Sequence, residues 1–303
     1  MLGSLAMVLV AGALARTLGA QYAAEQVLFL RFVVSLAVVG PAALALAGRP
    51  ASIRRALTIR RPLPHAVRAV TGVGAALIFY KATQHLPFAD LVALSTSAPI
   101  FVALLSRLLT GERVSAASAA CIAAGLAGVF LVAPPTQLAV WSLAAVAMAA
   151  LNAVCILATR KAAQSDGPAA TGLVFVLAGT LLTLPAALAG FRMPALEDAP
   201  AFLMLGLAAG AAIVLNVKAF RLAPAALLAP IDYLGIAASV AVGYVWWGEV
   251  PTLAAAAGGA LITVAGIANV LLAGRPYQPS STPNQAVPNQ ADLGGSTSRP
   301  STR

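Results

Sequence analysis

The chain has 303 residues, of which 60% are hydrophobic and only 9% are charged, and its net charge is +10. A water-soluble domain has about a quarter of its residues charged, so this composition excludes a soluble protein and indicates a lipid surrounding. The basic residues lie between apolar runs without an aromatic-rich basic face, which argues against a nucleic-acid partner and is typical of membrane-protein loops. We therefore expect an integral membrane protein in contact with membrane lipid.

Ten apolar runs have the length of about 20 residues that a membrane-spanning helix needs. Residues 1–14 contain no basic region and no clear small-residue cleavage site, so we expect a retained first helix rather than a signal peptide. Gly, Pro and charged residues separate the runs. The predicted helices lie near residues 2–20, 27–47, 65–85, 88–109, 115–133, 137–158, 169–190, 199–219, 225–247 and 252–273.

The distribution of Lys and Arg predicts the orientation of these helices, because basic residues concentrate in cytosolic loops. A cytosolic N-terminus places the Arg-rich segment 49–68 inside, and most other basic residues fall on the same side. The four exceptions are Arg16, Arg31, Lys81 and Arg192. Both termini are therefore expected to be cytosolic. Residues 275–303 have almost no large apolar side chains, which predicts a disordered cytosolic tail.

An internal repeat divides the ten runs into two sets of five. One offset of 137 residues pairs Lys81 with Lys218, Pro87 with Pro224, and Glu112 with Glu249. The two copies are residues 1–134 and 137–274. Because five is odd, the second copy enters the membrane in the opposite sense, which predicts two inverted five-helix repeats. This architecture is typical of secondary transporters, whose substrate site lies near the bilayer midplane between the copies.

Short motifs recur in both halves of the chain. They are Leu86-Pro87-x2-Asp90, Ala98-Pro99 and Gly111-Glu112, then Ala229-Pro230-x-Asp232-Tyr233-Leu234, Gly243-Tyr244 and Gly248-Glu249-x-Pro251. These motifs resemble those of the EamA-type members of the drug/metabolite transporter superfamily, and most narrowly the branch of S-adenosylmethionine-uptake-like carriers. The resemblance covers about residues 1–274 and implies a ten-helix bacterial inner-membrane carrier with a central cavity. We expect helices 1, 3, 4, 6, 8 and 9 to line that cavity. Arg16 departs from the pattern, because related sequences often carry Lys late in the first helix.

Ionisable groups inside a membrane are costly, so each one is a candidate functional residue. Asp232 follows Pro230, which removes a backbone donor and loosens the helix. It is a candidate for binding a cationic substrate group or a coupling proton, with Tyr233 as a hydrogen-bonding wall, and a structural ion pair is the alternative. Arg16 is a candidate for binding a substrate carboxylate, with snorkelling to the headgroups as the alternative.

Polar residues within other helices give a second set of candidates. Lys81 and Lys218 occupy equivalent places in the two copies, where either gating or snorkelling explains them. Serine and threonine hydroxyls in helices often bond to the preceding turn, but repeat symmetry with Asp232 also suggests a cavity-lining role. The amides are explained by interhelical hydrogen bonds or by substrate contact, and Tyr80 by interface anchoring or by stacking on a planar substrate. These further substrate-binding candidates are Tyr80, Ser95, Thr96, Asn152 and Asn216.

The sequence contains no catalytic or metal-binding pattern. Cys121 and Cys155 lie inside apolar runs, and His65 and His85 are too few for a histidine-based metal centre. We therefore expect no metal and no cofactor, and a transporter rather than an enzyme. The expected function is alternating-access transport of a small polar or amphiphilic metabolite, amino-acid-like or nucleoside-like. A membrane-embedded enzyme and a non-transporting assembly protein are the alternatives, and transport direction, coupling ion and a monomeric or homodimeric state stay open.

Overall fold

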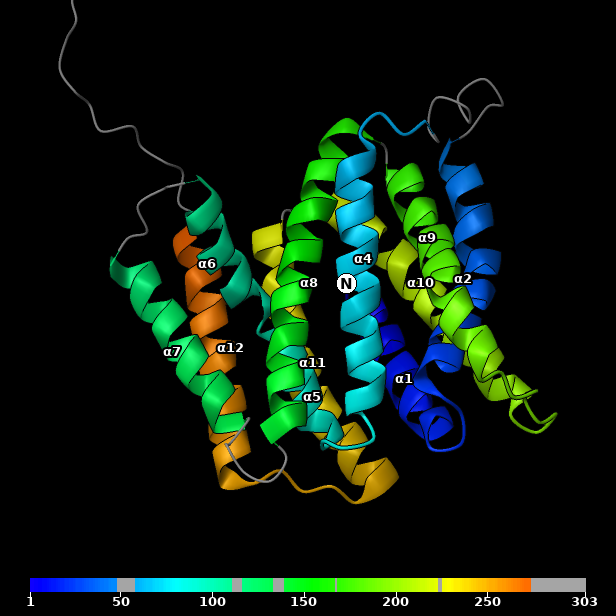
Figure 1. Cartoon of the computed structure of the whole chain (residues 1–303). Helices are drawn as coiled ribbons and strands as arrows, with labels where there is room; N and C mark the ends of the chain where they lie inside the picture. Colours follow the sequence, from blue (N-terminus) through cyan, green and yellow to red (C-terminus); the bar gives the residue numbers. More distant parts are fainter. Residues whose placement is uncertain (48–57, 111–115, 133–138, 167, 223–224, 274–303) are drawn as a thin grey trace, which may run out of the picture.

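The computed structural model describes residues 1–47, 58–110, 116–132, 139–166, 168–222 and 225–273. Throughout these described ranges, every regular element is a helix, and the helices stand roughly side by side (Figure 1). The first half contains α1 (Leu2–Gly19), α2 (Ala24–Ala47), α4 (Pro62–Ala82), α5 (Phe88–Thr96), α6 (Ala98–Thr110) and α7 (Ala116–Val132). The second half contains α8 (Ala139–Ser165), α9 (Pro168–Ala189), α10 (Ala199–Leu222), α11 (Ala225–Trp247) and α12 (Leu253–Ala273).

Each of the ten predicted runs is helical, with two differences in detail. Helix α8 continues to Ser165, several residues beyond the predicted end at 158. The fourth run is divided at Ser97 into α5 and α6. Pro99 has no backbone N–H to donate, and the Ser97 hydroxyl donates a 2.6 Å hydrogen bond to the carbonyl of Leu94, so the regular helical pattern is interrupted there.

The described helices have the length and composition of membrane spans. Seven of them, namely α1, α2, α4, α8, α9, α10 and α12, are long and apolar enough to cross a bilayer, and three further apolar helical stretches are shorter. Large apolar side chains such as Leu63, Val140 and Leu253 are more than two-thirds exposed. An outer surface of this kind suits lipid rather than water, so the fold is that of a polytopic all-helical membrane protein.

The closest helix pairs join the first half of the chain to the second. Helix α1 packs along α10, α2 along both α9 and α10, α4 along α8, α5 along α11 and α7 along α12. Serine hydroxyls tie two of these pairs, with Ser4 donating to the carbonyl of Ala212 at 3.0 Å and Ser35 to that of Gly206 at 2.9 Å. The buried side chains form two cores, one around Phe32 and one around Met148, and both cores contain residues from both halves.

The chain alternates between two ends of the helix bundle (Figure 1). The turns at residues 20–23, 83–87, 190–198 and 248–252 lie together at the lower end, called here the 83–87 face. Residues 58–61 lie at the upper end, called the 58–61 face. Asp166 belongs to the same face, because it accepts a hydrogen bond from the N–H of Arg60. Successive helices therefore cross the bundle in opposite directions, as the predicted spans require. The predicted tail at 275–303 lies outside the described residues.

Candidate functional site

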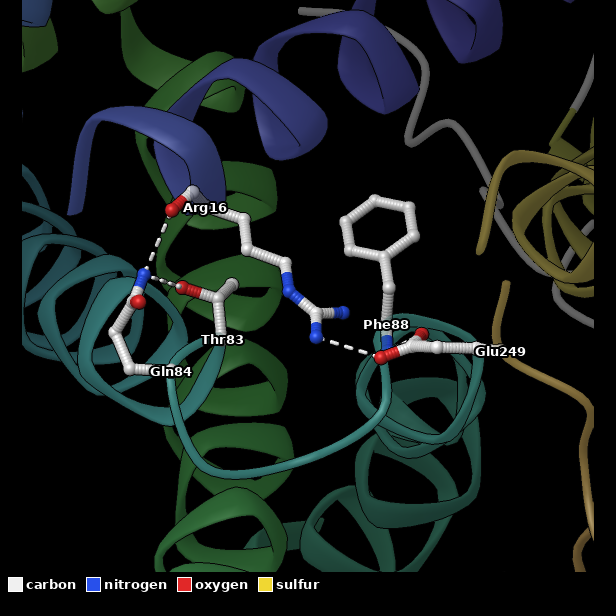
Figure 2. Close-up of polar contacts among 5 residues, drawn as sticks. All are labelled: Arg16, Thr83, Gln84, Phe88 and Glu249. Carbon is white, nitrogen blue, oxygen red and sulfur yellow. Dashed lines mark hydrogen bonds and ion pairs between the residues drawn. The ribbon is translucent and has the colours of Figure 1, made fainter. Parts of the chain in front are cut away.

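An ion pair at the 83–87 face joins the two halves of the chain. Arg16, in the last turn of α1, donates through Nη2 to Oε1 of Glu249 at 2.6 Å (Figure 2). The side chains are 18% and 19% exposed, so both charges are mostly removed from solvent. The two residues are 233 positions apart, and Arg16 was predicted as a site residue whereas Glu249 was not.

Glu249 is positioned by the way α11 ends. Gly248 adopts a positive φ of 66°, a conformation that only glycine takes at little cost. Its N–H bonds to the carbonyl of Tyr244 at 3.0 Å, and the N–H of Glu249 bonds to that of Gly243 at 3.1 Å. A glycine at positive φ whose N–H bonds to the carbonyl four residues earlier is the αL type of helix end. The sequence Gly248-Glu249 therefore stops the helix and turns the Glu249 side chain towards α1.

The second oxygen of Glu249 serves the N-terminus of α5. Its Oε2 accepts a 2.8 Å hydrogen bond from the backbone N–H of Phe88, the first residue of that helix (Figure 2). The residue before it, Pro87, provides no capping side chain. The first N–H groups of a helix need an acceptor and favour negative charge. Glu249 therefore connects three segments: the end of α1, the start of α5 and the turn between α11 and α12.

Aromatic and amide groups complete what we call the Arg16–Glu249 cluster. The Arg16 guanidinium lies 4.5 Å from the centre of the Trp247 ring, which itself lies 5.5 Å from that of Phe88. Gln84 donates a 2.8 Å hydrogen bond to the carbonyl of Arg16, which holds the end of α1 against the 83–87 turn (Figure 2). The Nη1 atom of Arg16 is buried and has no hydrogen-bond partner among the described residues.

Two more cations lie towards the same face. Lys81, predicted as a gating residue, pairs with Glu25 at 2.6 Å, and its side chain is 44% exposed. The Arg31 guanidinium lies 5.8 Å from the ring centre of Tyr80, a predicted substrate-binding residue that is buried in the core. Tyr80 therefore lies against a cation rather than at the lipid surface. The Arg31–Tyr80 contact and the Lys81–Glu25 pair both link α2 to α4.

Three of the polar candidates inside helices lie half-buried without joining the Arg16–Glu249 cluster: Ser95 on α5, Asn152 on α8 and Asn216 on α10. The Thr96 hydroxyl donates a 2.7 Å hydrogen bond to the carbonyl of Val92 one turn back. That bond is the local interaction expected for a threonine inside a helix.

The remaining predicted residues lie on α10 and α11. Tyr233 is buried, and its hydroxyl occupies the space that a side chain at Gly266 of α12 would fill. Lys218 is exposed on α10. Asp232 belongs to α11, but its side chain lies outside the described part of the structure. These residues are therefore spread over the bundle, and among the predicted residues only Arg16 belongs to the Arg16–Glu249 cluster.

A buried histidine–aspartate pair lies at the opposite, 58–61 face. Nε2 of His65, in the first turn of α4, lies 2.8 Å from Oδ2 of Asp166, which follows α8, and both side chains are almost fully buried. Asp166 also accepts a 2.9 Å hydrogen bond from the N–H of Arg60. Burial alone would raise the pKa of Asp166, but the bonds from Arg60 and His65 outweigh it and hold this pKa below its ordinary value.

Sequence reasoning missed Glu249 and the His65–Asp166 pair. The signal for Glu249 was Arg16, since a charge inside an apolar helix requires a counter-charge. The signal for Asp166 was its position in the break before Pro168, together with His65 at the predicted start of a helix. In both cases the partner is more than 100 residues away, so the sequence offers no rule for choosing it.

The fold is that of a multi-pass membrane protein with charge pairs at both ends of an apolar helix bundle, and comparison with known proteins identifies its class as a transporter. A sequence model of the EamA-like transporter family matches residues 1–133. The chain is 30% identical over 206 residues to the pseudopaline exporter CntI of Pseudomonas aeruginosa strain UCBPP-PA14, covering 67% of this chain and 72% of the exporter. This chain belongs to the EamA-like transporter family of the drug/metabolite transporter superfamily, as predicted, and is a transporter rather than an enzyme.

Two further similarities extend the comparison. The chain is 25% identical over 206 residues to a riboflavin transporter of Brucella anthropi, covering 65% of this chain and 72% of that protein. A crystal structure with 24% sequence identity superimposes with a TM-score of 0.62, covering 90% of this chain and 96% of the other, and supports the fold alone. The narrower resemblance to S-adenosylmethionine-uptake-like carriers stays a prediction.

Proposed function

We propose that this transporter is a secondary carrier that moves a small polar or amphiphilic metabolite across the bacterial inner membrane by alternating access. The observation that carries the proposal is the Arg16–Glu249 pair, because it joins the two halves of the chain at one face of the bundle. A carrier of this kind must close one face while it opens the other. An ion pair can hold such a face closed if it joins two segments that move apart when the face opens, as α1 and the turn between α11 and α12 would do.

The helix packing supports the inverted repeat that this mechanism needs. Exchanging the halves turns α1 into α8, α2 into α9, α4 into α10, and α7 into α12. The pairs α2–α9 and α7–α12 then map onto themselves, and α1–α10 maps onto α4–α8. A packing pattern with two-fold symmetry is what two related copies, residues 1–134 and 137–274, produce when they face in opposite directions.

Charge supports an orientation in which the 58–61 face is cytosolic. Arg60 and Arg61, which belong to the Arg-rich segment 49–68, lie at that face. At the 83–87 face, Arg16 and Lys81 are each neutralised by a carboxylate. The positive-inside rule then directs the 83–87 face outwards and both termini inwards. The Arg16–Glu249 pair would accordingly close the outer side of the membrane.

The residues predicted from the sequence are proposed to line the substrate path, since each one places a polar group on an otherwise apolar helix. Asp232 is also the proposed site of a coupling proton, and Lys81 and Lys218 are proposed gating residues. The names of the relatives, an exporter of pseudopaline and transporters of riboflavin, support a small organic cargo. The proposed substrate-binding residues are Arg16, Tyr80, Ser95, Thr96, Asn152, Asn216, Asp232 and Tyr233.

Closure of the 83–87 face is tested by labelling a cysteine placed next to Arg16 in the sequence. Ala15 is 1% exposed, so in an Ala15→Cys variant lacking Cys121 and Cys155 a membrane-impermeant maleimide should react slowly from outside. We expect Glu249→Gln to raise the labelling rate about tenfold, because a neutral amide holds Arg16 more weakly. Glu197→Gln, at an exposed carboxylate in the 190–198 turn of the same face, is the matched control and should leave the rate unchanged. Equal labelling with and without the Glu249 carboxylate would contradict the closure, and labelling only in inverted vesicles would reverse the orientation.

Transport itself is tested in proteoliposomes. Vesicles containing the protein are loaded with riboflavin, amino acids or nucleosides, and exchange with external labelled compound is measured. We expect at least one compound to exchange above protein-free vesicles, and Arg16→Gln and Asp232→Asn to reduce its rate. Exchange that neither substitution changes would contradict the proposed site, and an inactive panel would contradict the proposed substrate range.

A further inference from the structure

Arg16 uses only part of its hydrogen-bonding capacity in the ion pair. A guanidinium can bind a carboxylate through two parallel N–H bonds, which is the strongest form of this interaction. Here only Nη2 contacts Glu249, whereas Nη1 is buried with no hydrogen-bond partner among the described residues. An unsatisfied buried donor is costly, so this position favours a second acceptor.

Glu249 cannot supply that second acceptor, because its other oxygen is already used. Oε2 accepts the Phe88 N–H at 2.8 Å, which directs it to the start of α5 and away from Nη1. The Arg16–Glu249 pair therefore uses one hydrogen bond where an arginine and a carboxylate can form two, which makes Glu249 easier to displace.

We propose that Arg16 docks a carboxylate group of the transported ligand and that this carboxylate opens the 83–87 face by displacing Glu249. The proposal rests on the transport function proposed above and adds the chemical class of the ligand and the way in which it releases the closure. The incoming carboxylate binds both Nη atoms of Arg16. It thereby satisfies the donor that Glu249 leaves unpaired.

The displaced Glu249 does not lose all of its partners. Its Oε2 keeps the Phe88 N–H and the positive end of the α5 helix dipole, which stabilise a carboxylate at that position. The ring of Trp247, 4.5 Å from the guanidinium, gives Arg16 an apolar platform in either state. Exchange between the two carboxylates therefore leaves neither Glu249 nor Arg16 without an interaction partner.

Propionate and propionamide test the exchange, because they have nearly the same size and differ in charge. Purified protein in detergent is titrated with each at constant ionic strength. The thermal unfolding midpoint as a function of concentration gives an apparent dissociation constant, and the labelling rate of the Ala15→Cys variant reports opening. We expect propionate, but not propionamide, to raise the unfolding midpoint and the labelling rate. Equal effects of the two compounds would overturn the proposal.

Substitutions on each side of the ion pair give opposite expected results. Glu249→Gln should bind propionate about tenfold more tightly, because the internal competitor is lost. Arg16→Gln should abolish the effect. Arg16→Lys keeps the positive charge but loses the two-armed geometry, so its affinity should fall about tenfold. Glu197→Gln should behave as the unaltered protein. An unchanged or weaker affinity in Glu249→Gln would overturn the exchange.

The outcomes separate this proposal from the proposed function. Propionate exchange without transport of any tested metabolite would contradict the carrier and leave the docking site standing. The opposite result is transport that carboxylates do not inhibit, in a protein where propionate fails to compete with Glu249. That result would contradict the docking site and leave the carrier standing.

Discussion

The side-chain amide of Gln26 makes both backbone hydrogen bonds of Arg192, a residue 166 positions away. Its Nε2 donates to the Arg192 carbonyl at 2.6 Å, and its Oε1 accepts the Arg192 N–H at 2.9 Å. Nearby, the Tyr22 hydroxyl donates to Asp198 at 2.7 Å and accepts the N–H of Ala195 at 3.0 Å. Two side chains at the α1–α2 junction therefore hold the 190–198 link, which has little regular structure of its own.

Gln26→Leu should destabilise the protein. The substitution keeps the side chain of similar size but makes it apolar, and it leaves both Arg192 backbone groups without their partner, at a cost of about 1–3 kcal/mol. The midpoint of thermal unfolding in detergent measures this. Gln21→Leu, at an exposed position five residues earlier, is the control and should change little. If the two variants unfold alike, the amide does not hold the link.

Gly128→Ala should disrupt the contact between α7 and α12. A Cβ at Gly128 would lie 2.8 Å from the carbonyl oxygen of Gly258, and a Cβ at Gly258 would lie 2.7 Å from that of Gly128. Backbone atoms cannot rotate away, so the helices must separate, at a cost of about 1–3 kcal/mol.

The double variant Gly128→Ala and Gly258→Ala should cost less than the sum of the two single variants, because one separation relieves both contacts. Gly74→Ala, whose nearest neighbour is a side chain at 3.7 Å, is the control in the same unfolding measurement. Strict additivity would contradict the direct glycine contact.

Gly248→Ala should act on both stability and the ion pair. A residue with a Cβ at a φ of 66° is strained by about 1–2 kcal/mol, and the turn that aims Glu249 at Arg16 depends on this conformation. We expect a lower unfolding midpoint together with faster labelling of the Ala15→Cys variant. Gly190→Ala is the control, since a Cβ there meets nothing within 4 Å. A stable variant with slow labelling would show that another conformation positions Glu249.

Asp166 should make the stability of the protein depend on pH in acid. Its pKa in the folded protein lies below the ordinary value of 3.8, so its contribution is fully present above that value. The contribution is lost as the pH falls through the folded pKa, because the carboxylate must then be protonated. The difference in unfolding midpoint between the unaltered protein and Asp166→Asn should be constant at neutral pH and shrink below about pH 4. A difference that grows in acid would contradict this assignment.

The helices could be predicted because apolar length and turn residues are local signals. Pro168, at a predicted break, begins a helix, where a missing N–H costs nothing. Pro62 begins α4 in the same way, three residues before the predicted start at 65. The interruption at Ser97 was not predicted, since it depends on how a serine hydroxyl and the nearby Pro99 act together inside an apolar run. The extension of α8 to Ser165 was also missed, because polar residues such as Arg160 and Lys161 resemble a loop but continue the helix beyond the apolar region.

The candidate site could be predicted only in part. Arg16 stood out because a charge within an apolar run requires an explanation. Glu249 did not, because a Glu after a Gly at a helix end resembles an ordinary loop residue. Their contact depends on how α1 packs against α10 and α11, and no local rule of sequence specifies that packing. Whether Asp232 and Tyr233 contact a substrate stays a prediction.

The pairing of helices across the two halves also bears on how the protein is made. Ser4, in the first turn of α1, finds its hydrogen-bond acceptor at Ala212, 208 residues later. The helices that leave the ribosome first must therefore wait in the bilayer with incomplete neighbours until much of the second half has been synthesised. Apolar helices tolerate this delay, since lipid satisfies their surfaces and their backbones are already hydrogen-bonded. The last helices to insert thus complete a structure that the first five helices cannot form by themselves.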